Sequence, residues 1–481
     1  MSHAPSSPST PGARIHAFAD DVLGELDGVA LARLVAGGAV HADELVAAAQ
    51  GRAGAVAGPL GAVAHQAPRP RRVPNRDSEL DAVPTYVKDN TDVAGMPTTF
   101  GTAAFVAGPA PADGRYARQF LATGMAALGK SRMPEFGLNA STEFAGAPPA
   151  RNPWDPDRSV GGSSGGSAAL VAAGVVPLAH ANDGGGSIRI PAAAAGLVGL
   201  KPTRGRHLDG LQAQRMPINL ISEGVVSRSV RDTAAFVHAV ERRWRNPALP
   251  PIGRVVGASS RRLRIGLLGE TVGPAELDET NRRALEDTAA LLESGGHRVE
   301  PVAMPVDERF AVDFLHYWGL LSLLISVTGR TLDRAFDPSR MDALSIGLRV
   351  HARRRLFEMP VALARLQRAG RRCAALFRDH EVVLSPVVAQ RTPSLGYLSP
   401  EVGYEELIVR LVRQVAITPL HNVAGFPAIA IPGPLDAGGL PTSTMLSATW
   451  GDERTLLELA FELEQARPFP RIQDVGGTGR V

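Results

Sequence analysis

A glycine-rich stretch between residues 161 and 191 constrains this chain more than any other part of its sequence. It reads GGSSGGSAALVAAGVVPLAHANDGGGSIRIP and holds two serine-bearing glycine turns, at residues 161–167 and 183–187. The run between them, residues 168–178, is apolar, rich in alanine and long enough for a helix. Glycine has no Cβ, so backbone N–H groups in such turns can converge on a negatively charged oxygen. The stretch therefore predicts a serine hydroxyl beside a cluster of N–H donors.

The basic residues carry a second signal. Of the 51 lysine and arginine residues, only Lys88, Lys130 and Lys201 are lysines. Arginine stays protonated, whereas a lysine can lose its proton when it is buried away from water. This usage indicates that at least one of the three positions needs a removable proton. The net charge of +3 is spread along the chain, so neither nucleic acid nor a membrane is expected as a partner.

The 481 residues divide into segments of different composition and hydrophobic pattern. Residues 1–15 are expected to be a disordered leader without the apolar segment of a signal peptide, so a cytoplasmic location is expected. Residues 16–80 are expected to form a helical segment packed on the main body, with two amphipathic helices in 18–53 and a Pro/Arg-rich connector at 68–76. The longest apolar run, around residues 318–327, is shorter than a membrane span.

The remaining elements can be read from hydrophobic pattern. Residues 83–88 predict a strand that ends at Lys88, residues 117–130 a helix and a short strand, residues 262–302 a βαβ unit, and residues 307–379 an almost wholly helical region. The single cysteine, Cys373, excludes an internal disulfide. No HExxH or paired-histidine spacing indicates a metal site. We therefore expect chemistry that uses neither a metal nor a cofactor.

Several motifs follow one another in a specific order and spacing. They are VKDN at 87–90, GK at 129–130 with MPEF at 133–136, RNPW at 151–154 before the first glycine turn, DGGGSIRIP at 183–191, and GLKPT at 199–203. Together they resemble the amidase signature family of serine amide hydrolases, and the resemblance covers residues 81–470. It implies a single large α/β domain, a mixed β-sheet core flanked by helices, at residues 81–475.

The resemblance also implies a Ser-Ser-Lys catalytic triad and an acyl-serine intermediate. The matching positions are Lys88, Ser163 and Ser187, which lie 75 and 24 residues apart. Ser187 would attack the carboxamide carbon, while Ser163 would pass the proton to Lys88 and later to the leaving amine. Lys88 can act as a base only when it is neutral, so burial must lower its pKa from about 10.4.

Two further groups of residues are expected around this triad. The oxyanion hole would consist of the backbone N–H groups of Gly184, Gly185, Gly186 and Ser187. The supporting residues would be Ser164, Asp183 and Arg189, since a buried charge beside such a site needs a partner. Ser164 adjoins Ser163, and the bridging role falls to Ser163 by its position in the motif. His180 reads as a hydrogen-bonded histidine at a strand end.

The sequence defines the substrate less closely. Many family members have threonines on both sides of the aspartate, where this chain has Asn182 and Gly184, and its version of the motif is similar to the 6-aminohexanoate cyclic dimer hydrolase branch. The expected substrate is a small-molecule amide, including cyclic or linear 6-aminohexanoate amides. Two alternatives stay open: the glutaminase subunit of a tRNA-dependent amidotransferase, and a non-catalytic nucleotide-binding protein. A homodimer is expected because many family members are dimeric.

Overall fold

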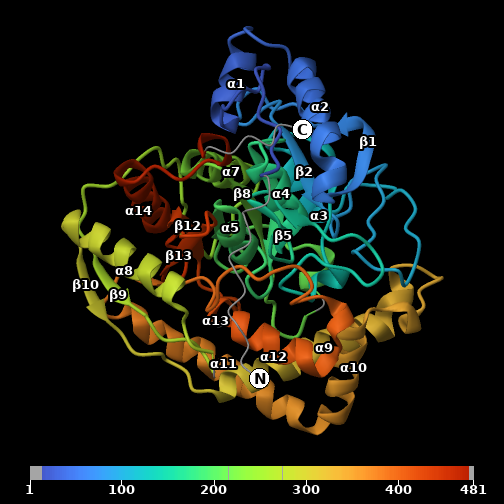
Figure 1. The fold of residues 1–481 in the computed structure, drawn as a ribbon, viewed down its shortest axis with the longest axis vertical. Coiled ribbons are helices and arrows are strands. Elements are labelled where there is room, and N and C mark those ends of the chain that lie inside the picture. The colour runs from blue at the N-terminus through green and yellow to red at the C-terminus, as the bar shows by residue number, and fades with distance from the viewer. Residues whose placement is uncertain (1–13, 215, 274, 416, 476–481) are drawn as a thin grey trace, which may run out of the picture.

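The computed structural model describes residues 14–475 except residues 215, 274 and 416. A mixed eight-stranded sheet runs through the body and helices pack around it (Figure 1). The helices are α1 (Gly28–Ala36), α2 (Ala42–Leu60), α3 (Arg115–Leu121), α4 (Gly165–Ala172), α5 (Arg189–Ala195), α6 (Leu211–Gln214), α7 (Val230–Arg243), α8 (Glu279–Ser294), α9 (Arg309–Thr328), α10 (Ala343–Arg354), α11 (Met359–Cys373), α12 (Tyr404–Gln414), α13 (Thr418–Ala424) and α14 (Glu453–Ala466). The strands are β1 (Val63–Arg71), β2 (Pro84–Lys88), β3 (Ala126–Ser131), β4 (Arg151–Asn152), β5 (Asp155–Ser159), β6 (Leu178–Asp183), β7 (Val198–Lys201), β8 (Ser222–Ser227), β9 (Arg264–Leu267), β10 (Arg298–Pro301), β11 (Val382–Pro386), β12 (Ala428–Leu435) and β13 (Pro441–Ala448).

The order of strands places the functional stretch at one end of the large sheet. Its order is β10-β9-β11-β13-β12-β7-β8-β6, with β10, β9 and β11 parallel and the other neighbours antiparallel. A second sheet has the order β1-β3-β2, and its strand β2 packs beside β6. The Thr85 hydroxyl donates to the carbonyl of Leu178 across this contact, at 3.0 Å. The end of β2 at Lys88 therefore lies against the end of β6. The mixed sheet flanked by helices confirms the predicted fold class.

The N-terminal segment agrees with the sequence in its helices and differs from it after them. Two helices form in this segment as predicted, but α1 begins only at Gly28 rather than near residue 18, and α2 runs past residue 53 to Leu60. Residues 68–71 of the predicted connector, however, belong to strand β1, which pairs antiparallel with β3. Prolines disfavour strands, but β1 is an edge strand, where a missing N–H costs no ladder bond on its open side. Most of the predicted leader, residues 1–13, lies outside the described residues.

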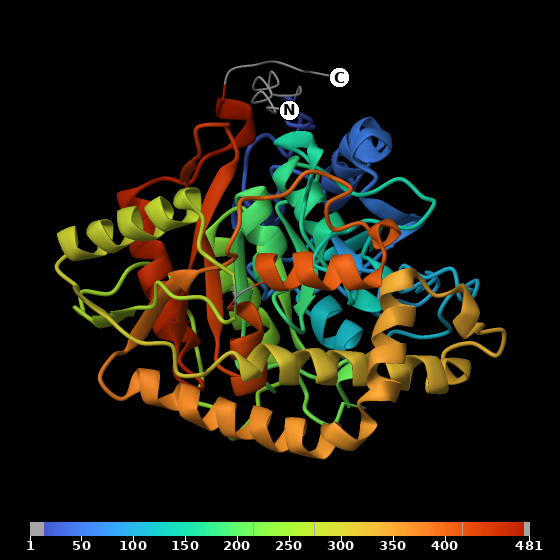
Figure 2. The same ribbon diagram turned by 60° about the horizontal axis from the view of Figure 1, so that its bottom comes forward.

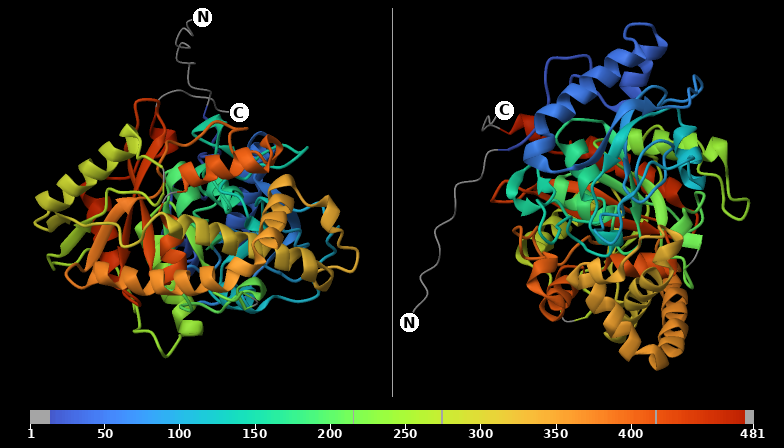
Figure 3. Two further views of the ribbon diagram at one scale, coloured as in Figure 1. Left: turned by 90° about the horizontal axis from the view of Figure 1, so that it is seen from below. Right: turned by 90° about the vertical axis from the view of Figure 1, so that its right-hand side faces the viewer.

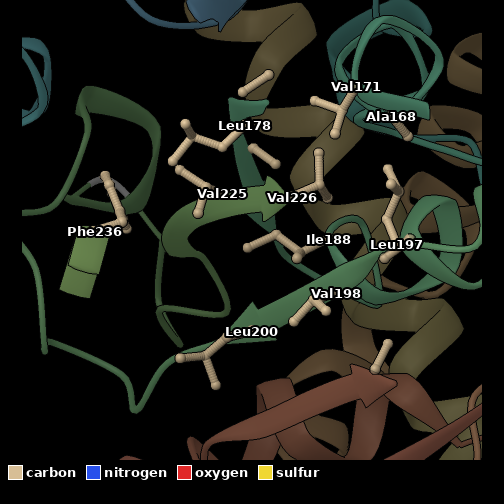
Figure 4. Close-up of a cluster of buried hydrophobic side chains, with 14 of the residues drawn as sticks. Ala168, Val171, Leu178, Ile188, Leu197, Val198, Leu200, Val225, Val226 and Phe236 are labelled. Carbon is tan, nitrogen blue, oxygen red and sulfur yellow. The ribbon is translucent and has the colours of Figure 1, made fainter. Parts of the chain in front are cut away.

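The glycine-rich stretch rests on a buried apolar core. Figure 4 shows Ala168 and Val171 of α4 facing the same cluster as Leu178 of β6 and Ile188, which directly follows the second turn. Gly166 in the first turn of α4 has no room for a side chain, since a Cβ there would lie 2.4 Å from the backbone nitrogen of Arg132. The helix predicted between the two turns is therefore α4, held tightly against β3 and β6.

A layer of helices from residues 309–373 covers the body at the end opposite to α1 and α2 (Figures 1, 2 and 3). The segment Arg309–Thr331 contains an 18-residue window with a mean hydropathy of 1.6 and is long and apolar enough, by length and composition alone, to cross a membrane. The prediction that no run reaches this length is wrong by this measure. Apolar residues continue before residues 318–327, and Asp313 and His316 interrupt them without lowering the mean hydropathy far enough. In this structure α9 packs against α10 and α11.

Candidate active site

The end of strand β2 brings Lys88 into the interior. Its side chain is 1% exposed, and its Nζ lies 2.8 Å from the Ser163 Oγ. The same nitrogen donates to the side-chain oxygen of Asn182 at 2.7 Å and lies 3.4 Å from the Asn182 carbonyl. Burial lowers the pKa of Lys88 to about 7, against the raising effects of Glu223 and Asp183. The site thus holds an amine that is partly neutral near neutral pH, next to a serine hydroxyl.

The other two lysines are buried as well but have different surroundings. Lys130 pairs with the Asp89 carboxylate at 3.4 Å and donates to the Thr98 hydroxyl at 3.0 Å. Lys201 donates to the carbonyl of Pro202 at 2.8 Å. Of the three lysines, Lys88 is the one in hydrogen-bond contact with a serine of the glycine turns.

The first glycine turn is joined to the second by the residue after Ser163. The peptide bond between Gly162 and Ser163 is cis. The N–H of Ser164 donates to the Ser187 carbonyl and its hydroxyl donates to the Asn182 carbonyl, both at 3.3 Å. Ser164 therefore connects the two turns, while the Ser163 hydroxyl stays beside Lys88.

Ser187 lies in the second turn, between β6 and α5, and borders the same cavity as Ser163. The N–H of Gly186 donates to the Asp183 carboxylate at 2.7 Å, so this group already has its acceptor. Among the described residues, the N–H groups of Gly184, Gly185 and Ser187 have no protein acceptor. Three of the four expected oxyanion donors are therefore free, and Gly186 is instead part of the support of the turn.

A buried ion pair supports this turn from beneath. Both side chains, Asp183 and Arg189, are fully buried and meet through two hydrogen bonds of 2.9 Å. The Arg189 guanidinium holds the pKa of Asp183 well below its usual range, against the opposing effect of burial. Asn422 of α13 donates to Asp183 at 2.9 Å and accepts from Arg189 at 2.7 Å. The carboxylate also accepts from the N–H groups of Gly186 and Ile188, so it fixes the path of the turn.

A cavity of about 230 Å³ opens onto both turns. Its floor includes Ser163 and Ser187, and its walls come largely from apolar side chains of α9, with others from α12 and the loop after β3. None of the described lining residues carries a charged side chain. The apolar wall residues include Phe136, Leu138, Ile190, Phe310, Phe314, Trp318, Leu321, Ile325 and Leu411. The site is therefore suited to a neutral molecule with an apolar body.

A metal has no evident ligands here. Across residues 14–475, apart from the three that are not described, no group of three or more His, Cys, Asp and Glu side chains is placed to hold an ion.

Comparison with known proteins assigns the family. The family model named Amidase matches residues 55–457. The chain belongs to the amidase family. A Mycobacterium leprae (strain TN) protein named "Putative amidase AmiC" is 48% identical over 465 residues, covering 96% of this chain and 99% of that protein.

Two further comparisons concern one named activity. The 6-aminohexanoate-cyclic-dimer hydrolase of Pseudomonas sp. (strain NK87) is 33% identical over 379 residues, covering 74% of this amidase and 76% of that protein. A solved structure of 6-aminohexanoate cyclic dimer hydrolase matches with a TM-score of 0.81 and 29% identity, covering 95% of this chain and 99% of that one. The resemblance stated from the motifs is confirmed, and the chain is a hydrolytic amidase.

Sequence reasoning missed several residues of the site. Asn182, a direct partner of Lys88, appeared in the sequence only as a departure from the threonine common in the family. Glu223 follows the second turn by 36 residues and reaches the site only because β8 pairs with β6. The residues of α9 that line the cavity could be recognised in the sequence only as part of an apolar helix, not as part of the site.

Proposed function

We propose that this amidase hydrolyses neutral carboxamides with an apolar body through an acyl-serine intermediate on Ser187. One observation carries the proposal: the buried amine of Lys88 lies 2.8 Å from the Ser163 hydroxyl, at the floor of a cavity that Ser187 also borders. A serine hydroxyl is a weak nucleophile until a base removes its proton. Lys88 is the base that this arrangement supports.

The surroundings of Lys88 suit a neutral amine. Such an amine has two N–H groups, which the side-chain and main-chain oxygens of Asn182 can accept, and one lone pair, which remains for the Ser163 hydroxyl. Ser163 then takes the proton of Ser187 as its own proton moves to Lys88. The Ser187 oxygen bonds to the carbonyl carbon, and on collapse of the tetrahedral intermediate the proton returns through Ser163 to the leaving amine. Water releases the acid by the same relay.

The second glycine turn supplies the electrostatic part of the reaction. As the carbonyl oxygen gains negative charge, the N–H groups of Gly184, Gly185 and Ser187 are the donors available to it. One donor of this kind is worth about 100- to 1,000-fold in rate. Donors fixed by a buried ion pair need little reorganisation when the charge appears, which supports this turn as the oxyanion hole.

The lining of the cavity supports a substrate without charge. Free glutamine carries an α-ammonium and an α-carboxylate, and no described lining residue offers either of them an opposite charge. A cyclic diamide built from methylene chains, such as the 6-aminohexanoate cyclic dimer, is neutral and largely apolar. The similarity to relatives named for that activity supports the same substrate class. We therefore favour an amidase of neutral amides over a glutaminase subunit.

The test is to incubate the purified protein with the cyclic dimer, a set of aliphatic and aromatic primary amides, and glutamine, and to follow each by mass spectrometry. Loss of the cyclic dimer with gain of its linear product would support the full proposal. Hydrolysis of primary amides alone would support the proposed mechanism but would exclude the cyclic dimer as a substrate. Hydrolysis of glutamine in preference to every neutral amide would contradict the proposal. The Ser187→Ala variant is the control for contaminating activity.

A further inference from the structure

A buried chain of contacts runs from Glu223 through His180 to the main chain of Lys88. The N–H of Lys88 donates to His180 Nδ1 at 3.1 Å, and His180 Nε2 lies 3.1 Å from a carboxylate oxygen of Glu223. The register of β6 and β8 places Asn182, the side-chain partner of Lys88, directly opposite Glu223. Two neighbouring strands therefore hold the main chain and the side chain of the same lysine.

The hydrogen bonds define the state of the histidine. Because the backbone N–H of Lys88 can only donate, Nδ1 of His180 must accept, and the ring proton is on Nε2, where it faces Glu223. A doubly protonated ring would place an N–H against the N–H of Lys88. Burial lowers the pKa of His180, in agreement with a neutral ring, although Glu223 opposes this effect. The rings of Tyr116 and Phe120, at 5.1 and 5.4 Å, pack against it.

Glu223 and Asp183, the two carboxylates that act on Lys88, have different bonding partners. Asp183 is bonded twice to Arg189, so its charge is compensated locally. Glu223 is 5% exposed and faces a neutral imidazole, so no cation is bonded to it among the described residues. Its charge therefore acts on Lys88 without a bonded counter-ion, and it acts on Tyr116, His180, His207 and Asp209 as well. The titratable and charged groups around Lys88 and Glu223 are His180, Asp183, Arg189, Lys130, Asp89, Tyr116, His207 and Asp209.

We propose that Glu223 is a positioning residue that, together with His180, holds Lys88 in place and sets the lower end of the pH range in which the enzyme works. The proposal rests on the proposed role of Lys88 as the base. Burial alone weakens a lysine as a base, because it disfavours the protonated form that the lysine must reach. A buried anion nearby restores part of that proton affinity, and a base acts best when its pKa lies near the working pH.

The test is the pH dependence of kcat/KM in the Glu223→Gln variant. Glutamine has the same size and can still accept from Nε2 of His180, but it carries no charge. Without the anion the protonated form of Lys88 is less favoured, so the midpoint of the acid limb should move to lower pH by about one unit, the shift that one nearby charge produces. A purely structural role would lower the rate at every pH and leave the midpoint unchanged, which would overturn the proposal.

The matched control is Glu143→Gln. Glu143 is also 5% exposed and accepts two hydrogen bonds, from the Ser141 hydroxyl and the Gly396 N–H, both at 2.7 Å. It is not among the groups that act on Lys88. This variant should keep the wild-type midpoint, and an equal shift in it would also overturn the proposal.

A second variant covers the case in which Glu223→Gln does not fold. In His180→Asn the amide oxygen can still accept from Lys88 N–H, but Glu223 loses the N–H donor that stabilises its negative charge beside Lys88. The midpoint should again move to lower pH, and the double variant should move no further than Glu223→Gln. Additive shifts would contradict the proposal. Full activity of Lys88→Ala would instead refute the proposed base, so the two failures can be told apart.

Discussion

Replacing Asp183 with asparagine removes the charge that organises the second glycine turn. One carboxylate oxygen accepts from the N–H of Ile188 and from both the N–H and Nε of Arg189, at 3.1, 3.4 and 2.9 Å. In the variant an amide NH₂ would occupy either this position or that of the other oxygen, which accepts from Gly186, Arg189 and Asn422. In both orientations donors face donors, and a fully buried guanidinium loses its counter-ion.

We expect Asp183→Asn to lower the free energy of unfolding by about 3–5 kcal/mol, the range for removing one partner of a buried ion pair. Each buried donor left without an acceptor costs about 1–3 kcal/mol, and the donors around Asp183 together give a cost in the same range. Because the pKa of Asp183 is held below its usual range, its contribution in the wild type is present above about pH 4 and is lost as pH falls through the native value.

The assay is urea unfolding at pH 7 of the wild type, Asp183→Asn, Arg189→Met and the double variant. Each single change should be costly, and the double change should cost clearly less than the sum, because removing both partners leaves no unpaired buried charge. A cost below about 1 kcal/mol for the single variants, or strict additivity, would refute this reasoning.

Three further predictions concern catalysis. Activity should fall below about pH 7 as Lys88 becomes protonated. Lys88→Arg should be as inactive as Lys88→Ala, with losses of about 1,000-fold or more in kcat. Near-wild-type turnover by the arginine variant would exclude a lysine base. Gly137 has a φ of +74° and a Cβ there would lie 3.2 Å from Ser163 Oγ. Gly137→Ala should therefore lower kcat by about 10- to 100-fold. An unchanged kcat would show that this serine tolerates displacement. Trp318 lines the cavity, and Trp318→Ala should lower kcat/KM for large apolar amides by about 10- to 100-fold, because these substrates lose buried apolar contact. The kcat/KM for acetamide should stay unchanged. Equal losses for both kinds of substrate would contradict a role of this cavity wall in substrate binding.

Local pattern was enough to predict much of the fold. The strand ending at Lys88, the βαβ unit of β9, α8 and β10, and the helices α9 to α11 each carry their signal within a short segment. Strand β1 was missed because Pro68 and Pro70 resemble a connector, and nothing local reveals that β3 pairs with it.

The triad positions could be placed from motifs, but their partners depend on register between distant strands. Lys88 and His180 are 92 residues apart, and Glu223 reaches the histidine only in the observed pairing of β6 with β8. A slip of one residue would turn each of these side chains to the other face of the sheet. The hydrogen bond of the Gly186 N–H to Asp183 is likewise a matter of turn geometry that sequence does not contain. A homodimer and a cytoplasmic location stay predictions.

The most direct test of the central claim is to trap the acyl-enzyme. The protein would be mixed with a reactive aryl ester or anilide, quenched in acid within milliseconds to seconds, and analysed by intact mass and peptide mapping. The account predicts one acyl group on Ser187, which is absent in Ser187→Ala and accumulates little in Lys88→Ala. A label on Ser163 or Ser164, or turnover without any covalent adduct under conditions where acylation outpaces deacylation, would contradict it.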